Sequence, residues 1–85
     1  MTRATEDLKT LYDCALDQVK PNRPPSRVLF RDAELFGLDA VSLTLSYSDS
    51  SSTYTWAIPL AMADWNGIHN MIVHHLINWD RQPQS

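Results

Sequence analysis

Glycine and cysteine are both scarce in this chain of 85 residues, which has two glycines and one cysteine. A loop that binds nucleotide phosphates needs several glycines close together, so Gly37 and Gly67 cannot form one. The single cysteine, Cys14, has no disulfide partner within the chain, which is typical of a protein in the reducing cytoplasm. Cys14 is also a poor nucleophile, because the neighbouring carboxylates of Asp13 and Asp17 disfavour the thiolate.

Long apolar runs are missing as well. The longest apolar stretch with little charge, residues 65–79, contains asparagine and histidine and is shorter than the roughly 20 residues that cross a bilayer. Glu6 and Asp7 stand where a secretion signal would have its apolar segment, so we expect neither a signal nor a membrane span. The net charge of -3 argues against nucleic acid as a partner, because phosphate backbones are bound by basic surfaces.

Charge is almost absent from one half of the chain. Residues 1–39 carry 13 of the 17 charged side chains, whereas residues 40–79 carry only Asp49 and Asp64. A small core cannot absorb so much neutral surface. We therefore expect the C-terminal half to meet another protein.

The N-terminal half is predicted to form a helix, a connector and a strand. An apolar stripe at intervals of three and four indicates an amphipathic helix over residues 5–20, with Thr5 as its N-cap: Leu8, Leu11, Tyr12, Ala15 and Val19. Pro21 ends the helix, and residues 20–26 form a proline-rich, extended connector. A strand then runs from about Arg27 to Phe30 or slightly beyond. Residues 32–39 either continue this strand into a turn around Gly37 or form one short helical turn.

The C-terminal half is predicted to form a hairpin and a second helix. Apolar and hydroxyl residues alternate strictly over 40–48, residues 49–52 form a turn, and 53–58 is the partner strand. Pro59 ends that strand and opens a helix that runs to about Trp79, followed by a loose tail over 82–85. The chain is therefore expected to be a single α+β domain spanning 1–85. Its order is α-β-β-β-α, with a three-stranded antiparallel sheet and both helices packed on one face.

This order of elements resembles that of double-stranded-RNA-binding domains. That family binds phosphates through a lysine cluster at the start of its second helix. Here the corresponding stretch, 59–64, reads Pro-Leu-Ala-Met-Ala-Asp and contains no lysine. None of the family's binding residues carries over, so the resemblance concerns the fold alone.

One face of the predicted second helix carries neutral side chains that can bind a partner. A solvent-exposed helix face usually carries lysine and glutamate, whereas protein interfaces are depleted in both. On the side opposite the apolar stripe this helix instead places Gly67, Asn70, Met71, His74 and Asn78. We predict that this face binds another protein or a second copy of the chain. The alternative is an ordinary solvated face without charge.

Two further features are secondary candidates. Lys20, Arg23, Arg27 and Arg31 lie in a stretch without acids and could bind an anion, or could pair with the acidic face of the first helix. Nine of the fourteen residues over 42–55 are serine or threonine, and alternation places Ser42, Thr44 and Thr55 on the sheet face away from the core. Such a face is either the open, solvated side of the sheet or a surface that accepts a partner strand.

The histidines do not form a metal site by their spacing. Helical metal ligands usually stand three or four residues apart, whereas His69, His74 and His75 do not. We expect no metal, cofactor or catalytic residue. The sequence thus favours a small cytoplasmic protein that acts as a regulator, inhibitor or adaptor of a partner protein. Proteins of this kind are often encoded by phages and other mobile elements. The alternatives are an anion or nucleic-acid binder that uses residues 20–31, and a small enzyme with a histidine at a dimer interface.

Overall fold

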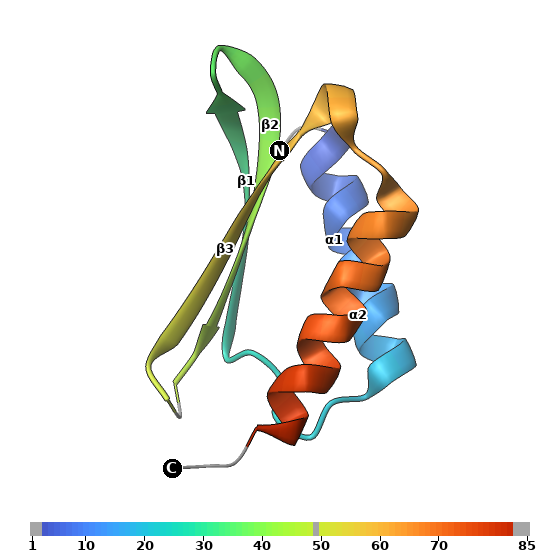
Figure 1. The fold of residues 1–85 in the computed structure, drawn as a ribbon, viewed down its shortest axis with the longest axis vertical. Coiled ribbons are helices and arrows are strands. Elements are labelled where there is room, and N and C mark those ends of the chain that lie inside the picture. The colour runs from blue at the N-terminus through green and yellow to red at the C-terminus, as the bar shows by residue number, and fades with distance from the viewer. Residues whose placement is uncertain (1–2, 49, 83–85) are drawn as a thin grey trace.

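The computed structural model describes residues 3–48 and 50–82. Its elements follow the order helix α1 (Arg3–Val19), strands β1 (Arg27–Leu35), β2 (Leu38–Tyr47) and β3 (Ser52–Pro59), the short 3₁₀ helix η1 (Leu60–Met62) and helix α2 (Trp65–Arg81). The strands form an antiparallel sheet in the order β1-β2-β3. Both helices lie side by side on one face of this sheet and run in the same direction (Figure 1). The α+β architecture predicted from the sequence is confirmed.

The core lies between β2 and the two helices. The central strand buries every second side chain, as expected for a sheet that is covered on one face. Three elements supply the buried cluster: Leu8, Tyr12 and Ala15 from α1, Val41, Leu43, Leu45 and Tyr47 from β2, and Ile68, Ile72, Leu76 and Trp79 from α2. Because each element contributes only one apolar stripe, none of them can bury its apolar surface alone.

The ends of α1 differ in part from the prediction. The helix begins at Arg3, so Thr5 is not its N-cap; the Thr5 side chain is 1% exposed and lies within the first turns. At the other end Lys20 has a φ of 50° and donates its backbone N–H to the carbonyl oxygen of Leu16 at 2.7 Å. This left-handed residue closes the helix as a C-terminal cap does. Pro21 then prevents the helix from continuing.

Residues 32–39 belong to the first hairpin, which settles the alternatives left by the sequence in favour of the strand. β1 continues to Leu35, and Leu35 pairs with Leu38 across a two-residue turn made by Phe36 and Gly37. Both turn residues have positive φ, 51° and 78°. Positive φ at both central residues is what a type I′ hairpin turn requires.

The second helix starts later than predicted. Pro59 is the last residue of β3, and the next three residues form η1. Ala63 is extended, and α2 begins only at Trp65, after Asp64 at the N-cap position. Ala61 and Met62, which helical spacing would place on the apolar stripe of the predicted helix, lie instead in η1 and are exposed.

The other hairpin matches its predicted position to within one or two residues. β2 and β3 pair from Ala40–Pro59 to Tyr47–Ser52, and the turn lies between them. Asp49, part of the predicted turn, lies outside the described residues. The same holds for 83–85 of the predicted loose tail. Gln82 is held in place, because its backbone N–H donates to the carbonyl oxygen of Trp79.

Candidate interaction surface

Helix α2 has one side toward the core and one side toward solvent. Ile68, Ile72, Leu76 and Trp79 form the buried stripe. Of the five predicted binding residues, four are exposed, namely Gly67, Asn70, His74 and Asn78. The fifth, Met71, is half-buried and packs against the core cluster, so it lies at the border of the predicted face and not in its centre.

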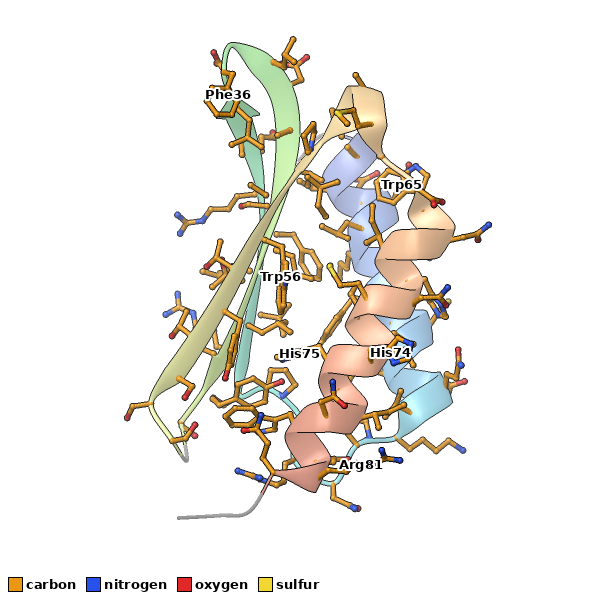
Figure 2. The ribbon with its side chains drawn as sticks, viewed as in Figure 1. Phe36, Trp56, Trp65, His74, His75 and Arg81 are labelled. Carbon is orange, nitrogen blue, oxygen red and sulfur yellow. The ribbon has the colours of Figure 1, made fainter. Side chains whose placement is uncertain are left out.

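Residue spacing shows which way this face turns. At 100° per residue, Met71 and Asn78 lie one turn before and one turn after His75, on the same side of α2. The His75 ring contacts two aromatic rings of β3, so this side faces β3. Figure 2 shows His75 and Trp56 in the space between β3 and α2, and His74 turned away from the sheet. The predicted face thus begins at the border with β3 and continues around α2 into solvent.

An aromatic cluster fills the space between β3 and α2. The Tyr47 hydroxyl lies 3.0 Å from Nε2 of His75. The His75 ring centroid lies 4.9 Å from that of Tyr54 and 5.1 Å from that of Trp56. Tyr47 in turn stacks on Trp79, with 4.0 Å between ring centroids. These five residues come from three elements, and no single pattern in the sequence places them together. The sequence signal for them is that Tyr54 and Trp56 alternate with threonine and alanine in the predicted strand, and that helical spacing places His75 beside the apolar stripe of the predicted second helix.

Burial sets the protonation of this cluster. It lowers the pKa of His75, because an imidazolium ion would lose its hydration between the rings. Burial also raises the pKa of Tyr47 far above its ordinary value, and that of Tyr12 to about 12. At neutral pH the Tyr47 hydroxyl therefore stays protonated, and it can donate a hydrogen bond to Nε2 of neutral His75. The cluster is therefore packed and uncharged at neutral pH.

Strand β3 is an edge strand without charge. In the order β1-β2-β3, both outer strands have a free edge. β1 carries four charged residues, Arg27, Arg31, Asp32 and Glu34, whereas β3 carries none. Charged side chains usually protect an edge from pairing with another chain. The inward-facing side chains of β3, Tyr54, Trp56 and Ile58, are half-buried and remain within reach of a partner.

These features adjoin one another and form what we call the β3–α2 surface. It consists of Tyr54, Trp56 and Ile58 from β3 and Gly67, Asn70, Met71, His74, His75 and Asn78 from α2. None of these residues carries a formal charge when the histidines are neutral. Near the start of α2 the side chain of Asp64 lies close to Gly67. A Cβ at that position would lie 3.0 Å from Oδ2 of Asp64.

The open face of the sheet collects most of the secondary candidates. Strand pairing places Arg27 beside Ser46 and Thr53, and Arg31 beside Ser42 and Ala57. A third row between these two consists of Leu29, Thr44 and Thr55. In this row Oγ1 of Thr44 lies 3.2 Å from Oγ1 of Thr55. Two arginines and a row of hydroxyl groups therefore share one face.

Arg23 does not belong to this group. Its guanidinium lies over the Trp79 ring at 5.2 Å, and Nη1 donates to the carbonyl oxygens of Trp79 and Gln82. It thus satisfies carbonyl groups at the C-terminal end of α2, where a helix leaves them unpaired. The structure separates Arg23 from Arg27 and Arg31, so the three do not form the single basic site that their spacing suggested.

Three further observations concern metal ligands, membrane spans and the cysteine. Among the described residues, no group of three or more histidine, cysteine or carboxylate side chains is placed to hold a metal ion. The helices that the structure describes are too short or too polar to cross a membrane. Cys14 is exposed and forms no disulfide.

Comparisons with known proteins identify no relative. No protein-family model matches the chain, and neither the curated proteins nor the solved structures contain a significant match. The order of elements shared with double-stranded-RNA-binding domains is therefore not accompanied by a match in sequence or structure.

Proposed function

We propose that this protein is a small interaction module without catalytic activity, which binds another protein or a second copy of itself through the β3–α2 surface. The observation that carries the proposal is the continuity of this surface. An unguarded edge strand, half-buried aromatic side chains and an uncharged helix face adjoin one another. Interfaces are enriched in aromatic residues and methionine and depleted in lysine and glutamate, which is the composition found here.

The apolar and the polar side chains of the β3–α2 surface would contribute to binding in different ways. Trp56, Tyr54 and Met71 are half-buried, so a partner that covers them removes further apolar area from water. They are rigid or packed already, which keeps the entropy lost on binding small. The exposed Asn70, His74 and Asn78 form a polar rim that can hydrogen-bond to the partner. We propose that the protein acts in the cytoplasm as a regulator, inhibitor or adaptor, to which the exposed, unpaired Cys14 is suited.

The test places charge on the surface without disturbing the core. His74→Lys combined with Asn78→Lys should weaken the complex at least tenfold, because an interface would have to bury unpaired ammonium groups. The matched control is Thr10→Lys combined with Gln18→Lys, which adds the same charge to the exposed face of α1. Proteins captured by the full chain from a lysate of the source cells are purified and titrated by calorimetry, and self-association is measured by sedimentation velocity.

The expected result is loss of binding in the α2 pair and near-normal binding in the α1 pair. A partner that binds both pairs equally well would contradict the proposal. So would a chain that stays monomeric at all concentrations and captures the same proteins with and without the α2 substitutions.

The open sheet face supports a second candidate function, binding of an anion. Arg27 and Arg31 are exposed and share this face with the hydroxyl groups of Ser42, Thr44 and Thr55. A fluorescent single-stranded oligonucleotide is a suitable probe, since phosphate-driven binding falls steeply with salt. Arg27→Gln combined with Arg31→Gln should abolish any such binding. Binding that is independent of salt and of both arginines would exclude this candidate.

A further inference from the structure

The tip of the β1–β2 hairpin carries a residue that its backbone conformation disfavours. Phe36 has a φ of 51° in the two-residue turn that it forms with Gly37. This left-handed region suits glycine, asparagine and aspartate, and those residues dominate the turn type found here. A bulky aromatic residue is a clear exception. Backbone exceptions of this kind concentrate where a protein binds or reacts.

Phe36 is also completely exposed. Its relative exposure is 102%, and its ring extends from the tip of the hairpin away from the core (Figure 2). The other large apolar side chains exposed in the described chain are Leu38, at 56%, and Met62, at 81%. Leu38 lies in the same hairpin, and η1, which holds Met62, contacts the adjoining strand β2. A single exposed apolar residue is ordinary, but a group of three gathered at one end of a small domain indicates a binding site.

A like-charged pair flanks this apolar tip. Glu34 pairs with Asp39 in the strand register, and both side chains are exposed. Like charges directly opposite each other destabilise an antiparallel pair. The hairpin supplies no counter-ion for them on this side, because Arg31 alternates to the other face and no lysine or arginine follows until Arg81. Among the side chains of this hairpin the arrangement is unfavourable, and it becomes favourable once a cation lies between the two carboxylates.

We propose that the hairpin tip, residues 34–39, is a second docking element, which inserts Phe36 into an apolar pocket of a partner protein. The Glu34–Asp39 pair binds lysine or arginine at the rim of that pocket. One kind of partner thereby covers the exposed ring and neutralises the acidic pair, and these contacts offset the backbone cost of placing Phe36 in the turn. An anionic membrane surface would relieve only the exposure and would repel the two carboxylates. The hairpin tip shares no residue with the β3–α2 surface, so the two proposals stand or fall separately.

The first test measures whether Phe36 stabilises the folded protein. Phe36→Asn places a residue suited to the turn at this position, so the melting temperature should rise. Glu34→Gln should raise it as well, because the like-charge pair is removed. Thermal melts followed by circular dichroism measure both. A fall in the melting temperature of Phe36→Asn would show that the phenylalanine stabilises the free protein and would overturn the proposal.

The second test identifies what the tip contacts. The photoreactive residue benzoylphenylalanine replaces Phe36 in the full chain, which is irradiated in a lysate of the source cells, and the adduct is mapped by mass spectrometry. The expected adduct lies on an apolar segment of another protein, with lysine or arginine nearby. Glu34→Lys combined with Asp39→Lys should lower its yield at least tenfold. The same photoreactive residue at the exposed Thr53 of β3 should not form it.

Several results would overturn the proposal. The first two are an adduct on a second copy of the chain and an adduct whose yield is unchanged by Glu34→Lys combined with Asp39→Lys. The others are an adduct formed equally well from position 53 and the absence of any adduct. A membrane is tested with vesicles of phosphatidylcholine, with and without phosphatidylserine. Co-sedimentation that depends on Phe36 would assign the tip to lipid and likewise overturn the proposal.

Discussion

His75 is a titratable side chain held between aromatic rings. It lies among Tyr47, Tyr54 and Trp56, and its Nε2 is 3.0 Å from the Tyr47 hydroxyl. Its depressed pKa has a cause that can be tested, since desolvation between the rings disfavours the imidazolium ion. A histidine of this kind contributes a pH dependence to folding without being catalytic.

The first prediction concerns stability against pH. Because the pKa of His75 is lower in the folded chain than its ordinary value of 6.5, the unfolded chain binds more protons near pH 6. The contribution of neutral His75 is therefore fully present above pH 6.5 and is lost as the pH falls toward the folded pKa. His75→Gln, which stays neutral and can still accept from Tyr47, should flatten the dependence of the unfolding free energy between pH 7 and 5.

The matched control is His74→Gln on the exposed side of the same helix turn. Urea titrations at each pH measure all three chains. The control should keep the wild-type dependence. If His75→Gln kept it too, His75 would titrate as an exposed histidine does.

The connector and α2 stabilise each other through a small set of polar contacts. The Asp80 carboxylate accepts hydrogen bonds from the backbone N–H groups of Asn22 and Arg23, at 2.9 Å each. Arg23 returns hydrogen bonds to the last carbonyl groups of α2 and lies over Trp79. The connector is thereby held against the helix end, which orients α1 and β1. The indole Nε1 of Trp79 is buried beneath these contacts without a hydrogen-bond partner.

The second prediction tests this connection. Asp80→Asn leaves one oxygen to serve two backbone N–H groups, so the free energy of unfolding should fall by about 1–3 kcal/mol. Asp17→Asn on the exposed face of α1 removes the same charge and should change it by less than about 0.5 kcal/mol. Chemical denaturation measures both. Equal effects of the two substitutions would mean that net charge, and not the connector contact, accounts for the change.

The whole molecule has one core to which three elements contribute. Leu43 lies at the centre of β2 and is fully buried. Neither helix nor sheet has a separate cluster of buried residues, since the buried apolar cluster joins α1, β2 and α2. A chain built in this way is expected to unfold in one cooperative step.

The third prediction follows from this shared core. Tryptophan fluorescence and far-ultraviolet circular dichroism should give coincident denaturation curves, although they report on side chains and on backbone. Leu43→Ala should shift both curves together by about 2–5 kcal/mol, because it removes buried contacts and leaves a cavity. Lys9→Gln on the exposed face of α1 serves as the control. Curves that separated, or a Leu43→Ala shift in one probe only, would indicate independently unfolding parts.

Local patterns in the sequence were sufficient to predict the order of elements. The alternation over 40–48 and the apolar stripe of residues 8–19 each report directly on a face that must be buried. The start of α2 was missed because Ala61 and Met62 fall on the helical stripe by spacing, and spacing alone does not reveal that Ala63 is extended. Thr5 stands before acidic residues as an N-cap does, but α1 begins at Arg3, so the same pattern falls inside the helix.

The candidate surfaces were predicted unevenly for the same reason. Residues 67, 70, 74 and 78 share a helix face, so periodicity alone places them together, and the structure leaves all four exposed. The half-buried position of Met71 depends on where β3 lies, which helical spacing does not reveal. The aromatic cluster joins residues from β2, β3 and α2, and no pattern within one segment indicates such a contact.

Composition and periodicity thus determined that this chain is one α+β domain with a nearly uncharged C-terminal half. The reason is that each helix or strand that is buried on one side repeats its apolar residues with the period of that element. Tertiary packing decided the rest. It placed His75 between the rings of β3, bound Arg23 to the end of α2, gathered Arg27 and Arg31 on the open sheet face and put Phe36 at an exposed tip. These outcomes depend on contacts between distant segments, whose geometry is set only when the shared core closes.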